Sequence, residues 1–341
     1  MTRENLKNLI FELSEAAGVT GLSGALSVCE KTLKPLQEVT LDNMGGLFCT
    51  IKGKSDYHIV LEAHIDEVGM IVTSVDDKGF VRVDRCGSAD IRVLPANEVI
   101  IFGKEHVKGV FCAPVPHLDK SSDVIPDITD MAIDTGLSNA KDVISPGDRV
   151  IFSQKPQELL NGRITGKSFD NRVGVAAVIS AFLRIYEENK LNCTVSLLLS
   201  AQEEVGLRGA TAAAYSLSPD EAVAVDVTFG GTYQSPAHKL GRLSQGPMIG
   251  VSPVLDFEMS QTFKSLAEEN DIPFQVEVMG GKTSTNADAI SISKSGVKCG
   301  LLSVPLRYMH TPVEVIDIAD VENTAELLYL YVKKAGTKFK R

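Results

Sequence analysis

Two histidines and several carboxylates in this chain stand beside hydrophobic segments, and side chains of these types bind metal ions. His64 and Asp66 follow the run HIVLEA, and His310 follows GLLSVPLRYM. The other candidates adjoin further apolar runs and are all carboxylates: Asp170, Glu203, Glu204 and Asp226. Imidazole suits Zn, Co and Ni, and carboxylate also accepts Mn and Mg. These ligands are too many for one closed zinc site, so they favour two divalent ions that share a bridging carboxylate.

A pair of ions of this kind would favour hydrolysis. Two metals about 3.5–4 Å apart clamp a water between them, and bound zinc lowers the pKa of water from ~15.7 toward ~7. A carboxylate outside the ligand set must then take the proton from that water and pass it to the leaving amine. Glu203 and Glu204 suit this division of roles, because adjacent side chains point in different directions.

The elements that must position these residues follow an alternating pattern outside residues 69–165. Strand-like apolar runs alternate with helix-like runs, as in TVSLLLS at 194–200 followed by RGATAAAYSL at 208–217. This alternation predicts an α/β fold with a largely parallel mixed sheet flanked by helices. In open α/β sheets, sites form at the carboxyl edge of the strands. We therefore expect the candidate residues at strand ends on that edge.

The pattern also predicts the individual elements. Further helices are expected near 22–33, 171–189, 258–270, 286–295 and 320–335. Further strands are expected near 46–52, 57–63, 221–228, 272–279 and 298–305.

Residues 69–165 have a different character. GMIVTSVDDKGFVRVDRCG reads as two β-rich runs around a DDKG turn, and short strands with Gly and Pro punctuation follow. We expect a small all-β, barrel-like domain here, inserted into a catalytic domain made of residues 1–68 and 166–341.

Composition narrows the class of protein. The 341 residues carry a net charge of −10, which argues against a nucleic-acid partner. No apolar run approaches the ~20 residues of a membrane helix, and the charged N-terminal segment does not resemble a signal peptide. Six scattered cysteines without a CxxC pair favour reduced thiols and a cytoplasmic location.

The remaining histidines carry less weight as ligands. His58 lies in an expected strand and favours packing, and His106 and His238 are expected in loops. His117, in PVPHLDK, stays open between the two readings.

Five segments in order resemble the tetrahedral aminopeptidases, a family of dinuclear metallopeptidases that includes glutamyl and deblocking aminopeptidases. Some relatives in that family carry endoglucanase names. The resemblance spans nearly the whole chain, and its segments are AHIDEVG, GKSFDNRVG, SAQEEVGLRGA, AVDVT and RYMHTPVEV.

The resemblance implies a role for each candidate residue. It makes His64 and Asp226 ligands of separate metals, with Asp170 as the bridge. Glu204 would bind one ion and His310 the other, and Glu203 would be the general base. Asp66 would hold the ring of His64 in place, as metal-binding histidines usually require. Two divalent ions per subunit are implied, with Zn or Co expected and Mn as a further candidate.

One segment departs from the family pattern. GGKTSTNADAI has Asn286 where the family often has Asp, and Asp288 lies two residues further on. This puts substrate recognition in question rather than metal binding. Lys282 and Arg307 are the basic residues that could meet an acidic substrate side chain, and a structural role is equally open for each.

Assembly is also implied by the resemblance. Family members dimerise through the β domain and form hollow tetrahedral dodecamers, so we expect self-association of this kind. The polar stretch 117–130 is expected to be a mobile loop near a catalytic pocket.

These observations predict a metal-dependent aminopeptidase that removes N-terminal residues from peptides. One alternative is an endoglucanase-type glycoside hydrolase that uses Glu203 and Glu204 as acid and nucleophile. Retaining glycosidases, however, need two carboxyls ~5–5.5 Å apart and no metal. A second alternative is a non-catalytic peptide-binding assembly on the same scaffold.

Overall fold

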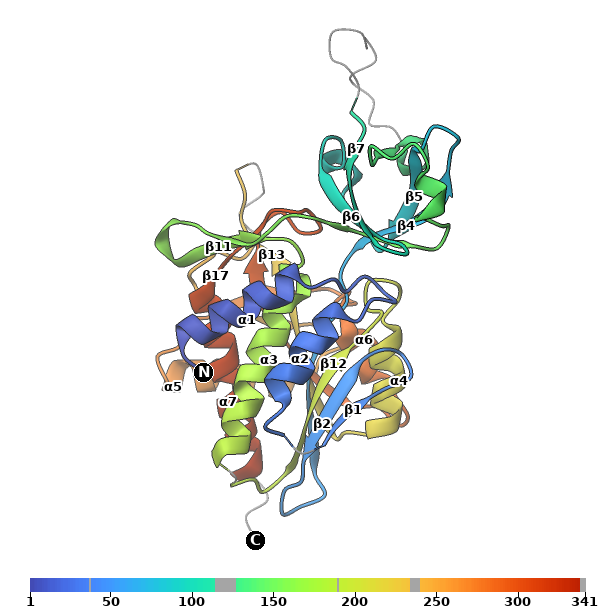
Figure 1. Cartoon of the computed structure of the whole chain (residues 1–341). Coiled ribbons are helices and arrows are strands. Elements are labelled where there is room, and N and C mark those ends of the chain that lie inside the picture. Colours follow the sequence, from blue (N-terminus) through green and yellow to red (C-terminus); the bar gives the residue numbers. More distant parts are fainter. Residues whose placement is uncertain (37, 114–126, 189, 234–239, 338–341) are drawn as a thin grey trace.

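The chain folds into an α/β part and a β barrel that lies to one side of it (Figure 1). The computed structural model describes residues 1–341 except 37, 114–126, 189, 234–239 and 338–341. The predicted fold class is confirmed, because a large mixed sheet is flanked by helices and a barrel is inserted between two of its strands.

An eight-stranded sheet forms the centre of the α/β part, in the order β1-β2-β12-β3-β13-β16-β14-β15. The central strands β12, β3, β13 and β16 run parallel, as expected for strands that are apolar along nearly their whole length and buried on both faces. The bounds are β1 (Val39–Leu41), β2 (Leu47–Ile51), β3 (His58–His64), β12 (Thr194–Ser200), β13 (Glu221–Phe229), β14 (Met248–Val251), β15 (Gln275–Val278) and β16 (Lys298–Leu306).

Helices cover both faces of this sheet and enclose its two hydrophobic clusters. One face is covered by α1 (Arg3–Glu15), α2 (Gly24–Leu33), α3 (Phe169–Glu188), α5 (Phe257–Glu269) and α7 (Ile318–Thr337). The other face is covered by α4 (Arg208–Leu217) and α6 (Asn286–Ser291). The helix α6 ends at Ser291, so it is shorter than the helix expected at 286–295, and the chain then turns into β16.

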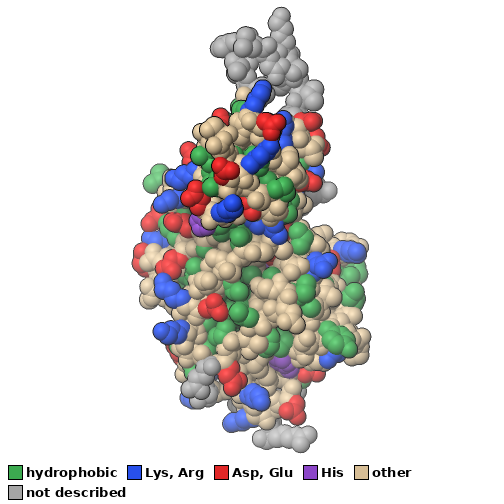
Figure 2. All heavy atoms as spheres, turned by 45° about the vertical axis from the view of Figure 1, so that its right-hand side comes forward, with side chains coloured by type: hydrophobic (Ala, Val, Ile, Leu, Met, Phe, Trp, Pro, Cys, Tyr) green, Lys and Arg blue, Asp and Glu red, His purple; other side chains and the backbone are tan. Residues whose placement is uncertain are grey.

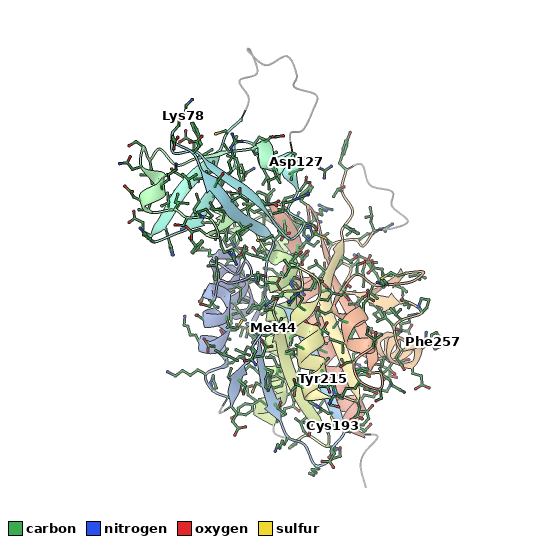
Figure 3. All side chains as sticks on the ribbon, turned by 90° about the vertical axis from the view of Figure 1, so that its right-hand side faces the viewer. Met44, Lys78, Asp127, Cys193, Tyr215 and Phe257 are labelled. Atoms are coloured by element: carbon green, nitrogen blue, oxygen red, sulfur yellow. The ribbon has the colours of Figure 1, made fainter. Side chains whose placement is uncertain are left out.

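The inserted module is a closed barrel with its own core, in the strand order β4-β5-β8-β7-β6-β9. Figure 3 shows Lys78 and Asp127 on this module and Cys193, which precedes β12, at the far end of the α/β part. The strand β12 therefore runs toward the barrel. His106 begins β7, so its expected place in a loop was wrong. The bounds are β4 (Gly69–Val75), β5 (Val81–Cys86), β6 (Glu98–Phe102), β7 (His106–Phe111), β8 (Ile133–Asp134) and β9 (Arg149–Phe152).

A small three-stranded sheet follows the barrel and leads back into the α/β part. It contains β10 (Gln157–Glu158), β11 (Arg163–Gly166) and β17 (Glu314–Asp317), all antiparallel. Because β11 ends just before α3 and β17 just before α7, this sheet fixes where both long helices begin.

A buried charge cluster joins the two parts of the chain. Glu67, between β3 and β4, lies 2.7 Å from the Nζ atom of Lys167 and 3.7 Å from the guanidinium of Arg172. Oε2 of Glu67 faces Lys167, whereas Oε1 faces Arg172 and also accepts the backbone N–H of Gly18 at 2.7 Å. All three charged side chains are buried, so this cluster ties the entrance of the barrel to the loop after α1 and to the start of α3.

Positive and negative side chains are interspersed over the face shown in Figure 2. None of the helices in the described part of the chain combines the length and apolarity needed to cross a bilayer. The division into residues 1–68 plus 166–341 and residues 69–165 stays our proposal for the domain boundaries. The cytoplasmic location likewise stays a prediction.

Candidate metal centre

Two neighbouring parallel strands deliver the first pair of candidate residues. Glu62 of β3 registers with Ala224 of β13, so His64 and Asp226, each two residues further on, emerge side by side. The Nε2 atom of His64 lies 3.7 Å from Oδ1 of Asp226. We expected Asp226 at the end of its strand, but it lies within β13. Pairing with β16 extends β13 as far as Phe229, beyond the end of β3.

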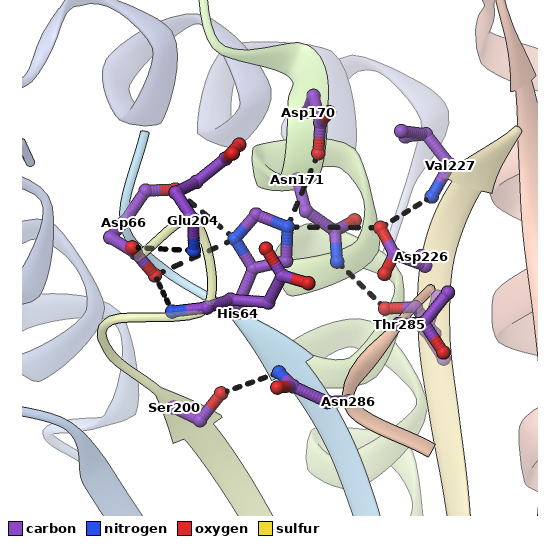
Figure 4. A network of polar contacts seen from close by, with 12 residues as sticks. His64, Asp66, Asp170, Asn171, Ser200, Glu204, Asp226, Val227, Thr285 and Asn286 are labelled. Carbon is purple, nitrogen blue, oxygen red and sulfur yellow. Dashed lines mark hydrogen bonds and ion pairs between the residues drawn. The ribbon is translucent and has the colours of Figure 1, made fainter. Parts of the chain in front are cut away.

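Asp170 lies between the two imidazoles of the site. Its Oδ1 is 3.2 Å from Nε2 of His64, and its Oδ2 is 3.1 Å from Nε2 of His310. The neighbouring Asn171 donates a hydrogen bond to the backbone carbonyl of Val225 at 2.7 Å, which fixes the start of α3 against β13. Each oxygen of one carboxylate therefore faces a different histidine (Figure 4 shows the side facing His64).

The side chains form groups that could each hold an ion. One contains His64, Asp170 and Asp226, and another contains Asp170, Glu204 and His310. Asp170 belongs to both. The resemblance implied that His64 and Asp226 bind separate ions, whereas the adjacent registers of β3 and β13 place these two residues in one group.

Asp66 supports both halves of the site. Its carboxylate accepts the backbone N–H groups of Glu203 at 3.0 Å and of Glu204 at 3.2 Å. The same carboxylate lies 3.6 Å from Nδ1 of His64 (Figure 4). Asp66 therefore links the turn after β12 to the end of β3, and it does not reach the cavity that the other candidate residues line.

That cavity has a volume of about 370 Å³ and lies at the carboxyl edge of the sheet. Six of the candidate residues line it: His64, Asp170, Glu203, Glu204, Asp226 and His310. Neither Lys282 nor Arg307 is among the described residues that line it. His117 and His238 lie outside the described residues, as does most of the stretch 117–130.

The electrostatics of the centre favour a bound cation. Burial raises the pKa of Glu203 to about 8; His64 opposes this rise, and Asp226, Asp170 and Asp66 add to it. Burial also raises the pKa of Glu204 well above its usual range, with Asp170 adding to the effect. A divalent ion would relieve this excess of buried negative charge. The donor set of imidazole nitrogen and carboxylate oxygen fits ions such as Zn, Co or Mn.

The pKa values of the two imidazoles are also raised, which for histidine favours the charged form. Burial opposes protonation of His64, but the surrounding carboxylates outweigh it and raise its pKa well above the usual range. The same balance between burial and Asp170 raises the pKa of His310.

Sequence reasoning missed Glu314, which supports the site from β17. Its Oε1 accepts the backbone N–H of His310 at 2.8 Å, and its Oε2 accepts that of Asp170 at 3.1 Å. Glu314 is buried, and one carboxylate therefore positions two candidate ligands. The sequence feature that could have identified Glu314 is its place in RYMHTPVEV, four residues after His310.

Asn286 and Asp288 both take part in structural hydrogen bonds. The Nδ2 group of Asn286 donates to Oε1 of Glu62 at 2.7 Å and to Oγ of Ser200 at 2.9 Å, beneath His64. The carboxylate of Asp288 accepts the backbone N–H groups of Thr283 and Ser284. Asp288 thus shapes the loop that borders the cavity and does not take the place of Asn286.

The comparisons with known proteins agree with this architecture. The family model described as M42 glutamyl aminopeptidase matches residues 45–327, so the chain belongs to this family of peptidases. The chain is 29% identical to the lysyl aminopeptidase of Pyrococcus furiosus over 332 residues, which cover 94% of each sequence. The predicted resemblance is confirmed, and the chain is a peptide-bond hydrolase.

Solved structures extend the comparison to the fold. An aminopeptidase from the archaeon Desulfurococcus kamchatkensis matches with a TM-score of 0.92 and 30% identity, over 99% of this chain and 97% of that one. The TET1 peptidase of Pyrococcus horikoshii, described as assembling into a tetrahedron or a large octahedral shell, matches with a TM-score of 0.85 and 27% identity, over 95% and 98%. A Thermotoga maritima structure named endoglucanase matches with a TM-score of 0.77 and 29% identity, over 96% and 97%.

Proposed function

We propose that this M42 peptidase is a dinuclear-metal aminopeptidase that removes residues from the free N-terminus of peptides. The observation that carries the proposal is the place of Asp170, whose two oxygens lie 3.2 and 3.1 Å from the imidazoles of His64 and His310. A carboxylate shared in this way suits a bridge between two ions. His64 and Asp226 would complete one ligand set, and Glu204 and His310 the other.

When bound, such ions polarise the scissile carbonyl and make a water nucleophilic at neutral pH. Glu203 would accept the proton of the attacking water on a carboxylate oxygen and deliver it to the nitrogen of the leaving amine. Its raised pKa suits a group that must hold and then release that proton. Asp66 would keep Glu203 in place through the backbone N–H bond at 3.0 Å.

The two alternative functions have less support. A glycoside hydrolase needs a pair of free carboxyls across a sugar ring, whereas four carboxylates here, Glu203 and Glu204 among them, belong to groups that also contain histidine. A non-catalytic peptide-binding protein would have no need for a complete donor set. We propose Zn or Co as the resident ions, with Mn as a further candidate.

We also propose that the chain self-associates through the barrel, with a dimer as the basic unit and a tetrahedral dodecamer as the final particle. The neighbouring TET1 peptidase, which is described as assembling into a tetrahedron, supports this proposal. Light scattering tests it. A monomer that keeps full specific activity at nanomolar concentration would contradict it.

Chelation tests the metal requirement. The protein is stripped with a chelator, and hydrolysis of a panel of aminoacyl-anilides is measured before and after Zn, Co or Mn is added back. We expect activity to disappear and to return with metal. An N-acetylated anilide serves as the control for exopeptidase action, and carboxymethyl cellulose serves as the glycosidase substrate. Aminoacyl-anilide hydrolysis that survives complete metal removal would overturn the proposal.

A further inference from the structure

Glu277 is a carboxylate in the cavity that the metal centre does not use. It lies on β15, and the hydroxyl of Thr228 on β13 donates a hydrogen bond to its Oε1 at 2.7 Å. Thr228 is two residues beyond Asp226, so both side chains project from the same face of β13. Glu277 therefore faces the same space as the metal ligands while standing apart from them.

The register of the sheet explains how a side chain on β15 reaches so far. Glu277 registers with Gly250 on β14, and a Cβ atom at Gly250 would lie 3.0 Å from Cβ of Leu301. Leu301 lines the cavity. Gly250 thus places no side chain of its own between Glu277 and Leu301, and the Glu277 carboxylate reaches the hydroxyl of Thr228.

The wall around Glu277 combines apolar surface with one acidic group. Phe229, Met279, Leu301 and Met309 line the cavity together with Glu277. A long aliphatic stem that ends in a cation matches such a surface, because the stem packs on apolar atoms while the head meets the carboxylate.

The charges that line the cavity also favour a substrate side chain that ends in a cation. The described lining includes five carboxylates: Asp170, Glu203, Glu204, Asp226 and Glu277. Three of them belong to the proposed ligand sets and Glu203 is the proposed base, which leaves Glu277 to face substrate. The described lining holds neither Lys nor Arg, so nothing in it would neutralise an acidic substrate side chain.

Building on the proposed aminopeptidase function, we infer that Glu277 selects peptides whose first residue is basic, lysine or arginine. Thr228 occupies Oε1 and leaves Oε2 to accept a hydrogen bond from the substrate ammonium or guanidinium. Burial raises the pKa of the Glu277 carboxyl, and Asp226 adds to this rise. A substrate cation would stabilise the ionised carboxylate that burial disfavours.

Norleucine is the appropriate comparison, because it keeps the aliphatic stem of lysine and lacks the ammonium. With the metal-loaded enzyme, kcat/KM is measured for the anilides of lysine, arginine, norleucine and glutamate. A hydrogen bond to a charged group predicts a lysine-to-norleucine ratio of about 10–100. Glu277→Gln should bring that ratio toward one, and Glu277→Lys should raise activity on glutamate relative to lysine.

The matched control is Glu268→Gln, on the exposed side of α5. It removes one negative charge from the same domain outside the cavity and should leave the lysine-to-norleucine ratio unchanged. Metal content, measured on each variant, should equal that of the wild type, which shows that the centre is intact.

The outcomes separate this inference from the proposed function. If norleucine and lysine anilides are cleaved at similar rates and Glu277→Gln leaves their ratio unchanged, the selectivity assignment is wrong while the aminopeptidase proposal stands. If Glu268→Gln changes the ratio as much as Glu277→Gln does, the selectivity comes from general charge attraction and not from a specific contact with Glu277. If no aminoacyl-anilide is cleaved with metal present, the proposed function fails first.

Discussion

The buried carboxylate of Glu314 accepts a hydrogen bond from the backbone N–H of Asp170 at 3.1 Å. Its second oxygen does the same for His310 at 2.8 Å. These bonds hold a proposed bridging ligand and a proposed terminal ligand at a fixed separation, although the two residues are far apart in the sequence.

Glu314→Gln should therefore weaken metal binding. The glutamine amide would point an NH₂ group at one of the two backbone N–H donors, so one of the two positioning bonds is lost. Loss of such outer partners typically costs about 10–100-fold in metal affinity. Competition with a chelator measures the affinity, and the exposed Glu105→Gln serves as the control. An unchanged metal affinity in Glu314→Gln would show that the bonds to Glu314 do not position the ligands.

Glu203→Gln should separate chemistry from metal binding. Removal of the proposed base should lower kcat by about 10²–10⁴-fold. The metal content should stay near that of the wild type, because Asp170, Glu204 and both histidines remain. Elemental analysis together with steady-state kinetics checks both statements.

Asp170→Asn is the complementary variant, since it weakens a ligand shared by both groups. We expect it to lose metal and activity together. If Glu203→Gln empties the centre while Asp170→Asn keeps its metal, the two roles have been assigned the wrong way round.

Asn286→Asp should destabilise the fold. Asn286 donates to Glu62 and Ser200, and an aspartate would face these buried acceptors without a donor. An unsatisfied buried polar group costs about 1–3 kcal/mol, and burial already raises the pKa of Glu62 to about 7. Chemical denaturation measures the change, with the exposed Asn8→Asp on α1 as the control. Equal stability of the two variants would mean that the pocket around Asn286 accepts a carboxyl group.

Glu67→Gln should loosen the junction between the two parts of the chain. The change leaves Lys167 and Arg172 buried without their carboxylate, and breaking a buried pair costs about 3–5 kcal/mol. The unfolding transition measures this loss. Asp77→Asn is the control because it removes the exposed pair with Lys141, and it should have no measurable effect on unfolding.

Glu67→Gln should also change how the free energy of unfolding depends on pH. Burial acts to raise the pKa of Glu67, but Lys167 and Arg172 outweigh it and hold that pKa below the ordinary value of 4.5. The ionised carboxylate thus stabilises the folded protein above about pH 4.5, and the contribution is lost as the pH falls through the lower folded-state pKa. Unfolding of Glu67→Gln, measured over this acid range, should lack that part of the dependence. An equally steep loss in both proteins would place the titrating group elsewhere.

Local pattern was enough to predict the strands and most helices. TVSLLLS became β12 at 194–200 without a shift, because a short apolar run between polar turns leaves little choice of conformation. From the same pattern we predicted that His64, Asp170 and His310 lie at one edge of the sheet, because the carboxyl ends of parallel strands lie on the same side.

What could not be predicted depends on which strands become neighbours. The grouping of His64 with Asp226 follows from the pairing of β3 with β13, two segments more than 150 residues apart. Glu314 and Glu277 each stand in a run that reads only as a strand, in VEV and QVEV. Their roles depend on what faces them across the fold, and sequence periodicity carries no information about that.

The edge position of β15, which pairs with β14 alone among the described strands, has a consequence for how this peptidase can diverge. Under the assignment made above, selectivity is encoded on an edge strand, while the ligands lie on β3, β13 and α3 and in the turns after β12 and β16. A substitution on an edge strand disturbs the pairing with only one neighbouring strand. Evolution can therefore revise substrate choice here one substitution at a time and inherit the hydrolytic centre unchanged.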